Sequence, residues 1–258
     1  MVADAVHSLS DFVSDIAIIL TFRIVKKPVD KSHDYGHGKF ETLSTFIVGL
    51  LLLFIGIGIL RSGILNVIKI SGGIIPYQPR IIAFYAAVIS VITKEWLYRY
   101  TAKKGKEIKS DAIIANAWHH RTDAFTSVGT MIGIGLAVLM GHKWVIFDPI
   151  AAIMVSIFIL KISITIILKC TNEFMEASLS EETENKILKV VRSVDGVTNP
   201  HNLKTRKIGK NIAIDIHIEV DRNLNIVQAH NIASAVENKI KEEFGEETFI
   251  SVHTEPSE

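Results

Sequence analysis

Two short motifs in this sequence pair a histidine with an aspartate four residues later. His7 precedes Asp11 in one apolar segment, and His119 precedes Asp123 in another. Residues at i and i+4 share one face of a helix, so each motif directs an imidazole and a carboxylate to the same side. Two such helices facing each other supply two nitrogen and two oxygen ligands, which suits a four-coordinate divalent metal such as zinc.

The alternative is that these two histidines only hydrogen-bond neighbouring helices. Counting helical rise from the flanking basic residues Arg23 and Lys109 puts both motifs at a similar depth, near the middle of a membrane. An unpaired carboxylate is unfavourable there, and ionisable residues inside a membrane are by default functional. The matching spacing and depth therefore favour one shared metal site over two separate structural histidines.

Two further groups of potential ligands lie outside the apolar segments. The first occupies a glycine-containing loop and consists of Asp30, His33 and His37. The second consists of histidines scattered over the C-terminal part, namely His201, His217, His230 and His253. The alternative for the loop is a polar turn with solvated histidines. Taken alone, the scattered histidines indicate only a solvated surface.

The composition and the distribution of charge indicate which kinds of element position these residues. Hydrophobic residues make up 48% of the 258 residues and charged residues 21%, below the average of about 25% for soluble domains. Basic residues outnumber acidic ones by 18 to 11 in residues 1–169, and acidic residues outnumber basic ones by 16 to 10 in the remainder. This pattern excludes a disordered chain and indicates an apolar, basic part followed by a soluble, acidic tail. The single cysteine excludes a disulfide scaffold or a thiolate cluster.

The apolar part predicts membrane helices, because spanning a bilayer takes about 20 mostly apolar residues. The five predicted helices cover residues 1–24, 40–68, 79–101, 110–140 and 146–169. Within the third, Lys94 and Glu95 lie near one end, where they could snorkel to the interface. Basic residues concentrate in segments 23–39 and 99–109, so these loops and the tail are expected to be cytoplasmic. The alternative, a buried all-α core, is disfavoured by three nearly uncharged runs of this length.

The tail predicts a small α+β domain. Residues 180–194 form an amphipathic pattern with Ser180 as the N-cap. Residues 203–208 and 211–220 flank a glycine turn, and the second run alternates strictly between apolar and polar residues, as in a half-buried hairpin strand. A helix at 226–244 and a strand at 248–253 complete the order α-β-β-α-β. The predicted domains are therefore 1–170 in the membrane and 176–258 outside it.

The sequence resembles the cation diffusion facilitator family through five motifs spread over nearly the whole chain. The motifs are A-D-A-V-H-S-L-S-D (3–11), H-D-Y-G-H-G-K-F-E (33–41), N-A-W-H-H-R-T-D-A (116–124), F-D-P (147–149) and V-Q-A-H-N (227–231). The resemblance implies an all-α membrane bundle followed by a cytoplasmic, metallochaperone-like α+β domain, assembled as a homodimer. It implies five of the family's six membrane helices here, the first helix of this sequence corresponding to the family's second.

The resemblance also implies an activity and a set of site residues. Members of the family carry Zn²⁺, Cd²⁺, Fe²⁺, Co²⁺ or Mn²⁺ out of the cytoplasm in exchange for protons, by alternating access. Two histidines with two aspartates resemble the zinc-preferring members, so we expect Zn²⁺ as substrate and regulatory ligand, and no catalytic cofactor. The matching residues are His7, Asp11, His119 and Asp123 for transport, Asp30, His33 and His37 in the loop, and His201, His217, His230, His253 and Glu255 in the tail. The resemblance further implies a charge contact between subunits from Lys39 to Glu176.

Other classes of protein fit the sequence less well. An intramembrane metalloenzyme is disfavoured because H-E-x-x-H, a nucleophile elbow and a P-loop are all absent from the sequence. A channel is disfavoured because a four-ligand cage binds too tightly for rapid conduction. A non-transporting metal sensor or scaffold subunit remains the main alternative. The expected partners are divalent ions, protons, the lipid bilayer of the cell membrane and a second copy of the chain, and not nucleic acid.

Overall fold

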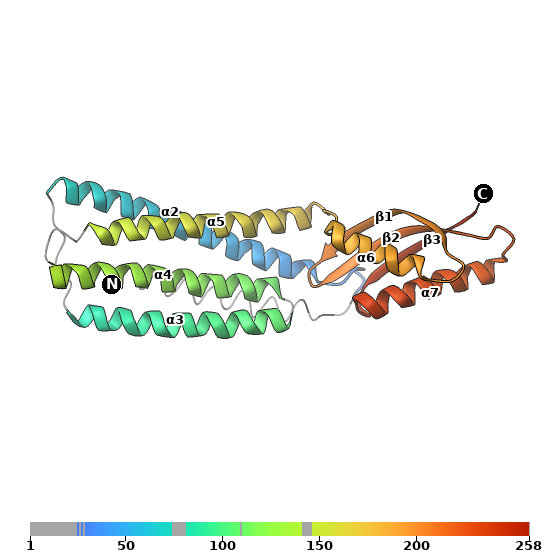
Figure 1. Cartoon of the computed structure of the whole chain (residues 1–258), viewed down its shortest axis with the longest axis horizontal. Helices are drawn as coiled ribbons and strands as arrows, with labels where there is room; N and C mark the ends of the chain where they lie inside the picture. Colours follow the sequence, from blue (N-terminus) through green and yellow to red (C-terminus); the bar gives the residue numbers. More distant parts are fainter. Residues whose placement is uncertain are drawn as a thin grey trace. The chain divides into compact units, whose positions relative to one another are not determined.

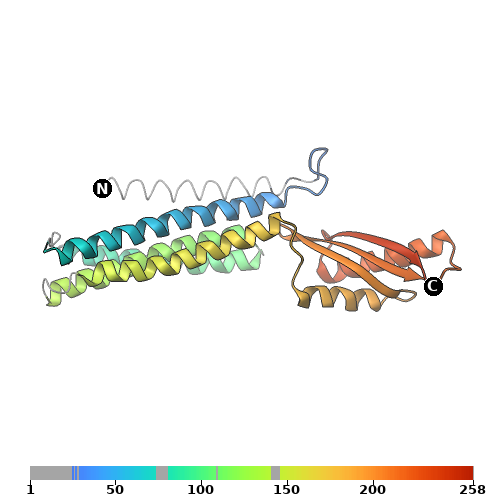
Figure 2. The ribbon, with the colours of Figure 1, turned by 90° about the horizontal axis from the view of Figure 1, so that it is seen from above.

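The computed structural model describes residues 25, 27, 29–73, 81–108, 110–140 and 146–257. Its apolar part contains four long helices in this range, which lie side by side (Figures 1 and 2): α2 (Lys39–Ser71), α3 (Ile81–Glu107), α4 (Asp111–Met140) and α5 (Phe147–Phe174). They confirm four of the predicted helices, and α3 and α5 continue past the predicted ends. The remaining predicted helix, 1–24, lies outside the described residues. By length and composition, α2 and α5 can each cross a membrane.

Helices α2 and α5 approach closely along a row of glycines on α2. Gly49, Gly56 and Gly63 recur every seven residues, and each faces apolar side chains of α5. A Cβ at Gly63 would lie 2.8 Å from Cγ1 of Ile153 and 3.1 Å from the carbonyl oxygen of Pro149. Small residues at such spacing let helix backbones pack closely where no hydrophobic driving force separates protein from lipid. This row was not predicted from the sequence.

Helices α3 and α4 form a second close pair, held by polar and aromatic contacts. The guanidinium of Arg121 lies over the Tyr98 ring, 4.3 Å from its centroid, and Nη1 donates a hydrogen bond to the Tyr98 hydroxyl at 2.7 Å. The Trp118 ring lies tilted beside the same tyrosine, with ring centroids 5.7 Å apart. The cation–π contact and the hydrogen bond together fix the rotation of α4 against α3.

The tail forms a three-stranded sheet with two helices, in the predicted order. Its elements are α6 (Glu181–Arg192), β1 (Thr198–Ile208), β2 (Asn211–Val220), α7 (Ile226–Phe244) and β3 (Phe249–Pro256). Strand β2 lies at the centre, antiparallel to β1 and parallel to β3. The Ser180 hydroxyl accepts a hydrogen bond from the Thr183 N–H, which confirms the predicted N-cap of α6.

The core of the tail explains why one face of the sheet remains open to ligands. Isoleucines at 214, 216 and 218 of β2 are almost fully buried against α6 and α7. Because side chains alternate across a strand, the residues between them, Asp215 and His217 among them, point to the opposite face. The two helices therefore cover one face, and the polar residues of β2 line the other.

Strand β1 begins five residues earlier than predicted and contains two irregularities. Register shifts occur on both sides of His201, and the flanking Asn199 and Asn202 have positive φ angles of 38° and 48°. Asparagine tolerates this left-handed conformation better than most residues, and proline, here Pro200, is accepted at bulges of edge strands. The run Asn-Pro-His-Asn, typical of a loop, is thus incorporated into a bulged strand.

The segment Val25–Phe40 packs with the tail as one compact unit. Gly38 lies against the turn between β1 and β2, where a Cβ on Gly38 would lie 2.7 Å from the Ile208 carbonyl oxygen. In the same turn, the Gly209 N–H donates a hydrogen bond of 2.9 Å to Oε1 of Glu173. Lys39 forms an ion pair with Glu176 within one chain, whereas the resemblance implied this contact between subunits.

Candidate metal sites

The membrane motif on α4 places its two ligands side by side and buries both. His119 and Asp123 are 2% and 3% exposed, and Nε2 of the histidine lies 4.0 Å from Oδ2 of the aspartate. A tetrahedral ion held at about 2.0–2.2 Å from each ligand would bring such atoms to about 3.4 Å apart. Small side-chain movements therefore suffice for both to bind one ion. The other two predicted ligands, His7 and Asp11, lie outside the described residues.

A cation approaches the same carboxylate from α3. Nζ of Lys94 lies 3.8 Å from Oδ2 of Asp123, the oxygen that faces His119. Glu95, the neighbour of Lys94, instead accepts from Arg99 at 2.8 Å one turn along α3. Lys94 was predicted to snorkel, and its contact with a candidate metal ligand was not foreseen.

The three loop residues also come together. Nδ1 of His33 and Nε2 of His37 each lie 3.5 Å from a carboxylate oxygen of Asp30, and the two rings are 4.3 Å apart. Three hydrogen bonds, from the hydroxyl and N–H of Ser32 and from the N–H of His33, converge on Oδ1 of Asp30. Oδ2 of Asp30 then faces His37.

Charge and burial in the loop suit a cation. The hydrogen bonds from Ser32, followed by the one from the His33 N–H and the proximity of His37, hold the pKa of Asp30 well below its usual range. His37 is 7% exposed, and its Nδ1 has no hydrogen-bond partner among the described residues. Nε2 of the same buried ring lies beside the Asp30 carboxylate, so this nitrogen and the carboxylate could bind one metal ion.

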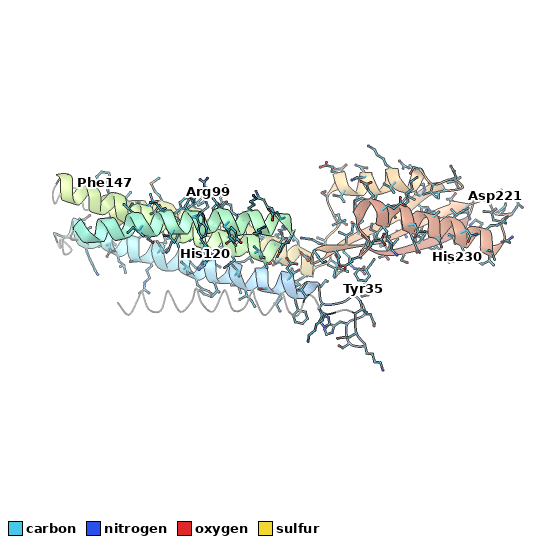
Figure 3. The ribbon with its side chains drawn as sticks, turned by 90° about the horizontal axis from the view of Figure 1, so that it is seen from below. Tyr35, Arg99, His120, Phe147, Asp221 and His230 are labelled. Atoms are coloured by element: carbon cyan, nitrogen blue, oxygen red, sulfur yellow. The ribbon has the colours of Figure 1, made fainter. Side chains whose placement is uncertain are left out.

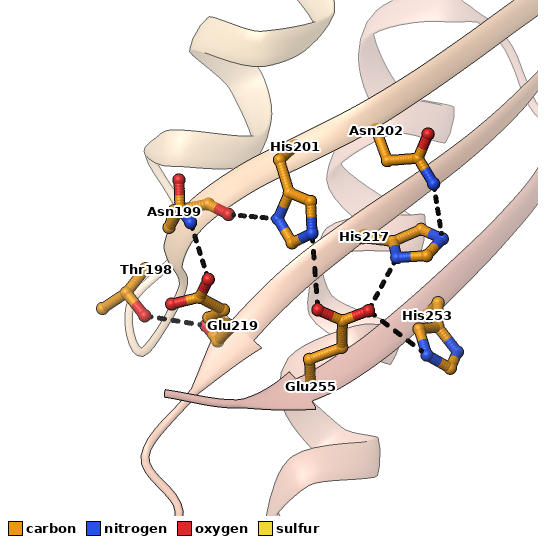
Figure 4. Close-up of polar contacts among 8 residues, drawn as sticks. All are labelled: Thr198, Asn199, His201, Asn202, His217, Glu219, His253 and Glu255. Carbon is orange, nitrogen blue, oxygen red and sulfur yellow. Dashed lines mark hydrogen bonds and ion pairs between the residues drawn. The ribbon is translucent and has the colours of Figure 1, made fainter. Parts of the chain in front are cut away.

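The tail cluster is assembled by the register of three strands. His201 on β1 is paired with His217 on β2, which is paired with His253 on β3. The carboxylate of Glu255 bridges the three histidines (Figure 4). Oε1 lies 2.8 Å from Nδ1 of His217 and 3.5 Å from Nε2 of His253, and Oε2 lies 3.3 Å from Nε2 of His201. The hydrogen bond from His217, and then the charges of the three imidazoles, lower the pKa of Glu255.

Two asparagines orient the histidines of this cluster, and neither was predicted from the sequence. Nδ1 of His201 donates to the carbonyl oxygen of Asn199 at 2.9 Å, which leaves Nε2 toward Glu255 (Figure 4). Nδ2 of Asn202 lies 3.1 Å from Nε2 of His217. Outer contacts of this kind fix the tautomer and direction of a ligating imidazole. The positive φ angles of Asn199 and Asn202 accompany the bulges of β1. No property of the sequence alone marks the two asparagines as partners of histidines.

Two predicted tail residues, His230 and His253, lie outside the tightest group of ligand atoms. His253 still lies 3.5 Å from Glu255. His201, His217 and Glu255 offer ligand atoms that all lie within 4.8 Å of one another. His230 is exposed on α7 (Figure 3), whereas the cluster belongs to the strands. Its role in metal binding remains a prediction.

Comparisons with known proteins agree with this architecture. The family model described as the cation efflux transmembrane domain matches residues 1–175, and the one described as the cytoplasmic domain of cation efflux proteins matches residues 179–257. The chain therefore belongs to the cation efflux family, and the predicted membership of the cation diffusion facilitators is confirmed.

Individual relatives cover most of the chain. Manganese efflux system protein MneP of Bacillus subtilis is 35% identical over 98% of this chain and 85% of its own length. Metal tolerance protein 2 of Oryza sativa is 32% identical over 97% of this chain and 69% of its own length. Magnetosome protein MamB of Paramagnetospirillum magneticum is 35% identical over 100% of this chain and 84% of its own length.

Proposed function

We propose that this protein is a membrane carrier that exports a divalent metal ion, Zn²⁺ in the first place, from the cytoplasm in exchange for protons. The observation that carries the proposal is the buried pair of His119 and Asp123, which sits within a membrane helix with its ligand atoms 4.0 Å apart. A carboxylate and an imidazole in such a place need a cation or a hydrogen-bond partner. A divalent ion shared with His7 and Asp11 of the first apolar segment would satisfy all four groups.

Exchange for protons follows from the chemistry of these ligands. Imidazole and carboxylate bind a metal only when they are deprotonated, so protons and metal compete for the same lone pairs. Alternating access to the two sides of the membrane would convert this competition into exchange. The family model of the cytoplasmic domain bears the name of a dimer domain, which supports a homodimer. Metal binding at the loop and tail sites as regulators is part of the proposal.

Manganese is the competing substrate. MneP is named as a manganese efflux protein, whereas a set of two imidazoles and two carboxylates is softer than the oxygen-rich sets that Mn²⁺ prefers. Zn²⁺, Fe²⁺ and Mn²⁺ must therefore be compared directly.

Metal uptake into proteoliposomes tests the proposal, with each ion offered with and without a pH gradient. We expect Zn²⁺ flux to exceed the others, to rise with the proton gradient and to fall to background in the Asp123→Asn variant. The matched control is Asp111→Asn on the same helix, since Asp111 pairs with Lys169 at 2.9 Å near the start of α4. Undiminished flux in Asp123→Asn would refute the site, and flux indifferent to the gradient would refute proton exchange.

A further inference from the structure

Lys94 occupies a position that a metal carrier would not be expected to give to a lysine. Its ammonium lies 3.8 Å from Oδ2 of Asp123, and the same oxygen lies 4.0 Å from Nε2 of His119. A fixed positive charge therefore faces the oxygen that a metal ion would have to share. The side chain of Lys94 is 30% exposed, whereas that of Asp123 is 4% exposed.

Depth explains why this lysine turns toward α4. Lys94 lies 13 residues before the end of α3 at Glu107, which corresponds to about 20 Å of helix. Asp123 lies 12 residues after the start of α4 at Asp111, or about 18 Å. Lys94 and Asp123 therefore lie at matching heights on the two consecutive helices, where the ammonium can reach the carboxylate.

The packing of α3 against α4 holds Lys94 opposite Asp123. Tyr98, one turn after Lys94 on the same face of α3, receives the hydrogen bond and the cation–π contact from Arg121. Arg121 also lies 5.3 Å from the Trp118 ring centroid. The charge of Arg121 is thus accommodated by aromatic faces, and that of Lys94 by Asp123.

We propose that Lys94 is a positioning residue of the transport site: its ammonium holds Asp123 in the metal-free carrier and is displaced when the metal binds. This inference rests on the proposed function, because it assumes that Asp123 binds the transported ion. Lys94 then acts as an internal competitor that occupies the carboxylate whenever metal does not.

Two consequences follow for the transport cycle. Binding of the metal must break the ion pair and place a divalent ion near the ammonium, so Lys94 lowers the affinity for metal and speeds its release. The empty carrier must also return across the membrane with Asp123 buried, and the lysine neutralises that carboxylate during the return. Removing the charge should therefore tighten binding and slow turnover together, which loss of a purely structural residue would not do.

Kinetics of Zn²⁺ and Mn²⁺ uptake into proteoliposomes test this combination. For Lys94→Gln and the apolar Lys94→Met we expect KM to fall by about tenfold or more, with a lower maximal rate. Lys94→Arg retains the charge and should restore KM to near the wild-type value. Lys161→Gln is the matched control, because Lys161 is an exposed lysine of α5 without an ion-pair partner among the described residues. A KM that is unchanged or raised in both uncharged variants overturns the proposal.

A measurement on the wild-type chain decides the matter even if these variants do not fold. An amine-reactive reagent should label Lys94 several-fold faster when Zn²⁺ is present, since the displaced amine is no longer held by Asp123, whereas the labelling of Lys161 stays constant. Asp123→Asn should give the fast rate without metal. Equal labelling of Lys94 with and without Zn²⁺ overturns the proposal. If the wild type transports neither ion, both the proposed function and this inference fail. If the wild type transports metal and Asp123→Asn does not, the proposed function stands, and labelling of Lys94 that does not change with Zn²⁺ refutes only the inference.

Discussion

The membrane pair on α4 and the cluster on the tail sheet use similar ligands in opposite surroundings. His119 and Asp123 come from one turn of one helix and are 2% and 3% exposed. His217 and Glu255 come from two neighbouring strands, and their side chains are 29% and 35% exposed. A helix aligns its ligands locally, whereas a sheet aligns them only once distant strands have paired. Burial also differs, so a missing partner should be far more damaging in the membrane than on the sheet.

The largest expected effect compares one histidine from each region. His119→Ala should lower metal flux by more than about 100-fold, because even outer-shell substitutions at metal sites reduce function by about 10- to 100-fold. His217→Ala removes a regulatory ligand and acts on transport only through coupling between sites, so we expect a loss of about tenfold or less. Initial rates of uptake into proteoliposomes measure both. Equal losses in the two variants would show that the tail cluster is as essential to transport as the membrane pair.

A smaller effect is expected from the residues that orient the tail ligands. Asn202→Ala removes the amide that lies 3.1 Å from Nε2 of His217, and we expect metal affinity at the tail to fall by about tenfold. Asn223→Ala is the matched control, since Asn223 hydrogen-bonds only to the nearby Asp221 among the contacts described.

Titration calorimetry of the full-length protein measures this affinity, in a background that carries Asp123→Asn and His37→Ala so that the tail site dominates the signal. Unchanged affinity in Asn202→Ala would show that strand pairing alone orients His217.

The sequence predicts the membrane pair on α4 better than the tail cluster, because a helix aligns its ligands locally and a sheet does not. The i, i+4 spacing alone brought His119 to Asp123, and the alternation of β2 alone put His217 on the open face. The hairpin, α7 and the N-cap of α6 were predicted because their signals are local. The tail ligand set came only from the family resemblance, since no local pattern relates Glu255 to residues some 40 to 50 positions earlier.

Several contacts between elements were not predicted. The glycine row of α2 has meaning only beside α5, and Lys94 was interpreted from its own helix rather than from the one that it faces. The early start of β1 was missed because Pro200 and the two left-handed asparagines around it are typical of loops. In each case the deciding interaction comes from a residue that is distant in the sequence.

The smallest expected effect concerns an ion pair of the tail that has the same chemistry as Lys94 with Asp123 but lies in water. Nζ of Lys210 lies 3.1 Å from Glu247, whose side chain is 69% exposed, and Asn211 donates to the same carboxylate. The hydrogen bonds from Lys210 and then Asn211 lower the pKa of Glu247 from its ordinary value of 4.5. The stabilisation is therefore complete above that pH and is lost as the pH falls through the lowered pKa of the folded state.

Because exposed pairs contribute little, Glu247→Gln should raise amide hydrogen exchange in the turns around Gly209 and Gly245 by about twofold at pH 7. Below the lowered pKa the wild type and the variant should exchange alike, since the wild-type carboxylate is then also neutral. Exchange in the full-length protein, followed by mass spectrometry across this pH range, measures the difference, and affinity of the tail for metal should stay unchanged. A tenfold or larger increase would mean that this solvated pair holds the strand register, and that exposure is a poor guide to which charges matter in this protein.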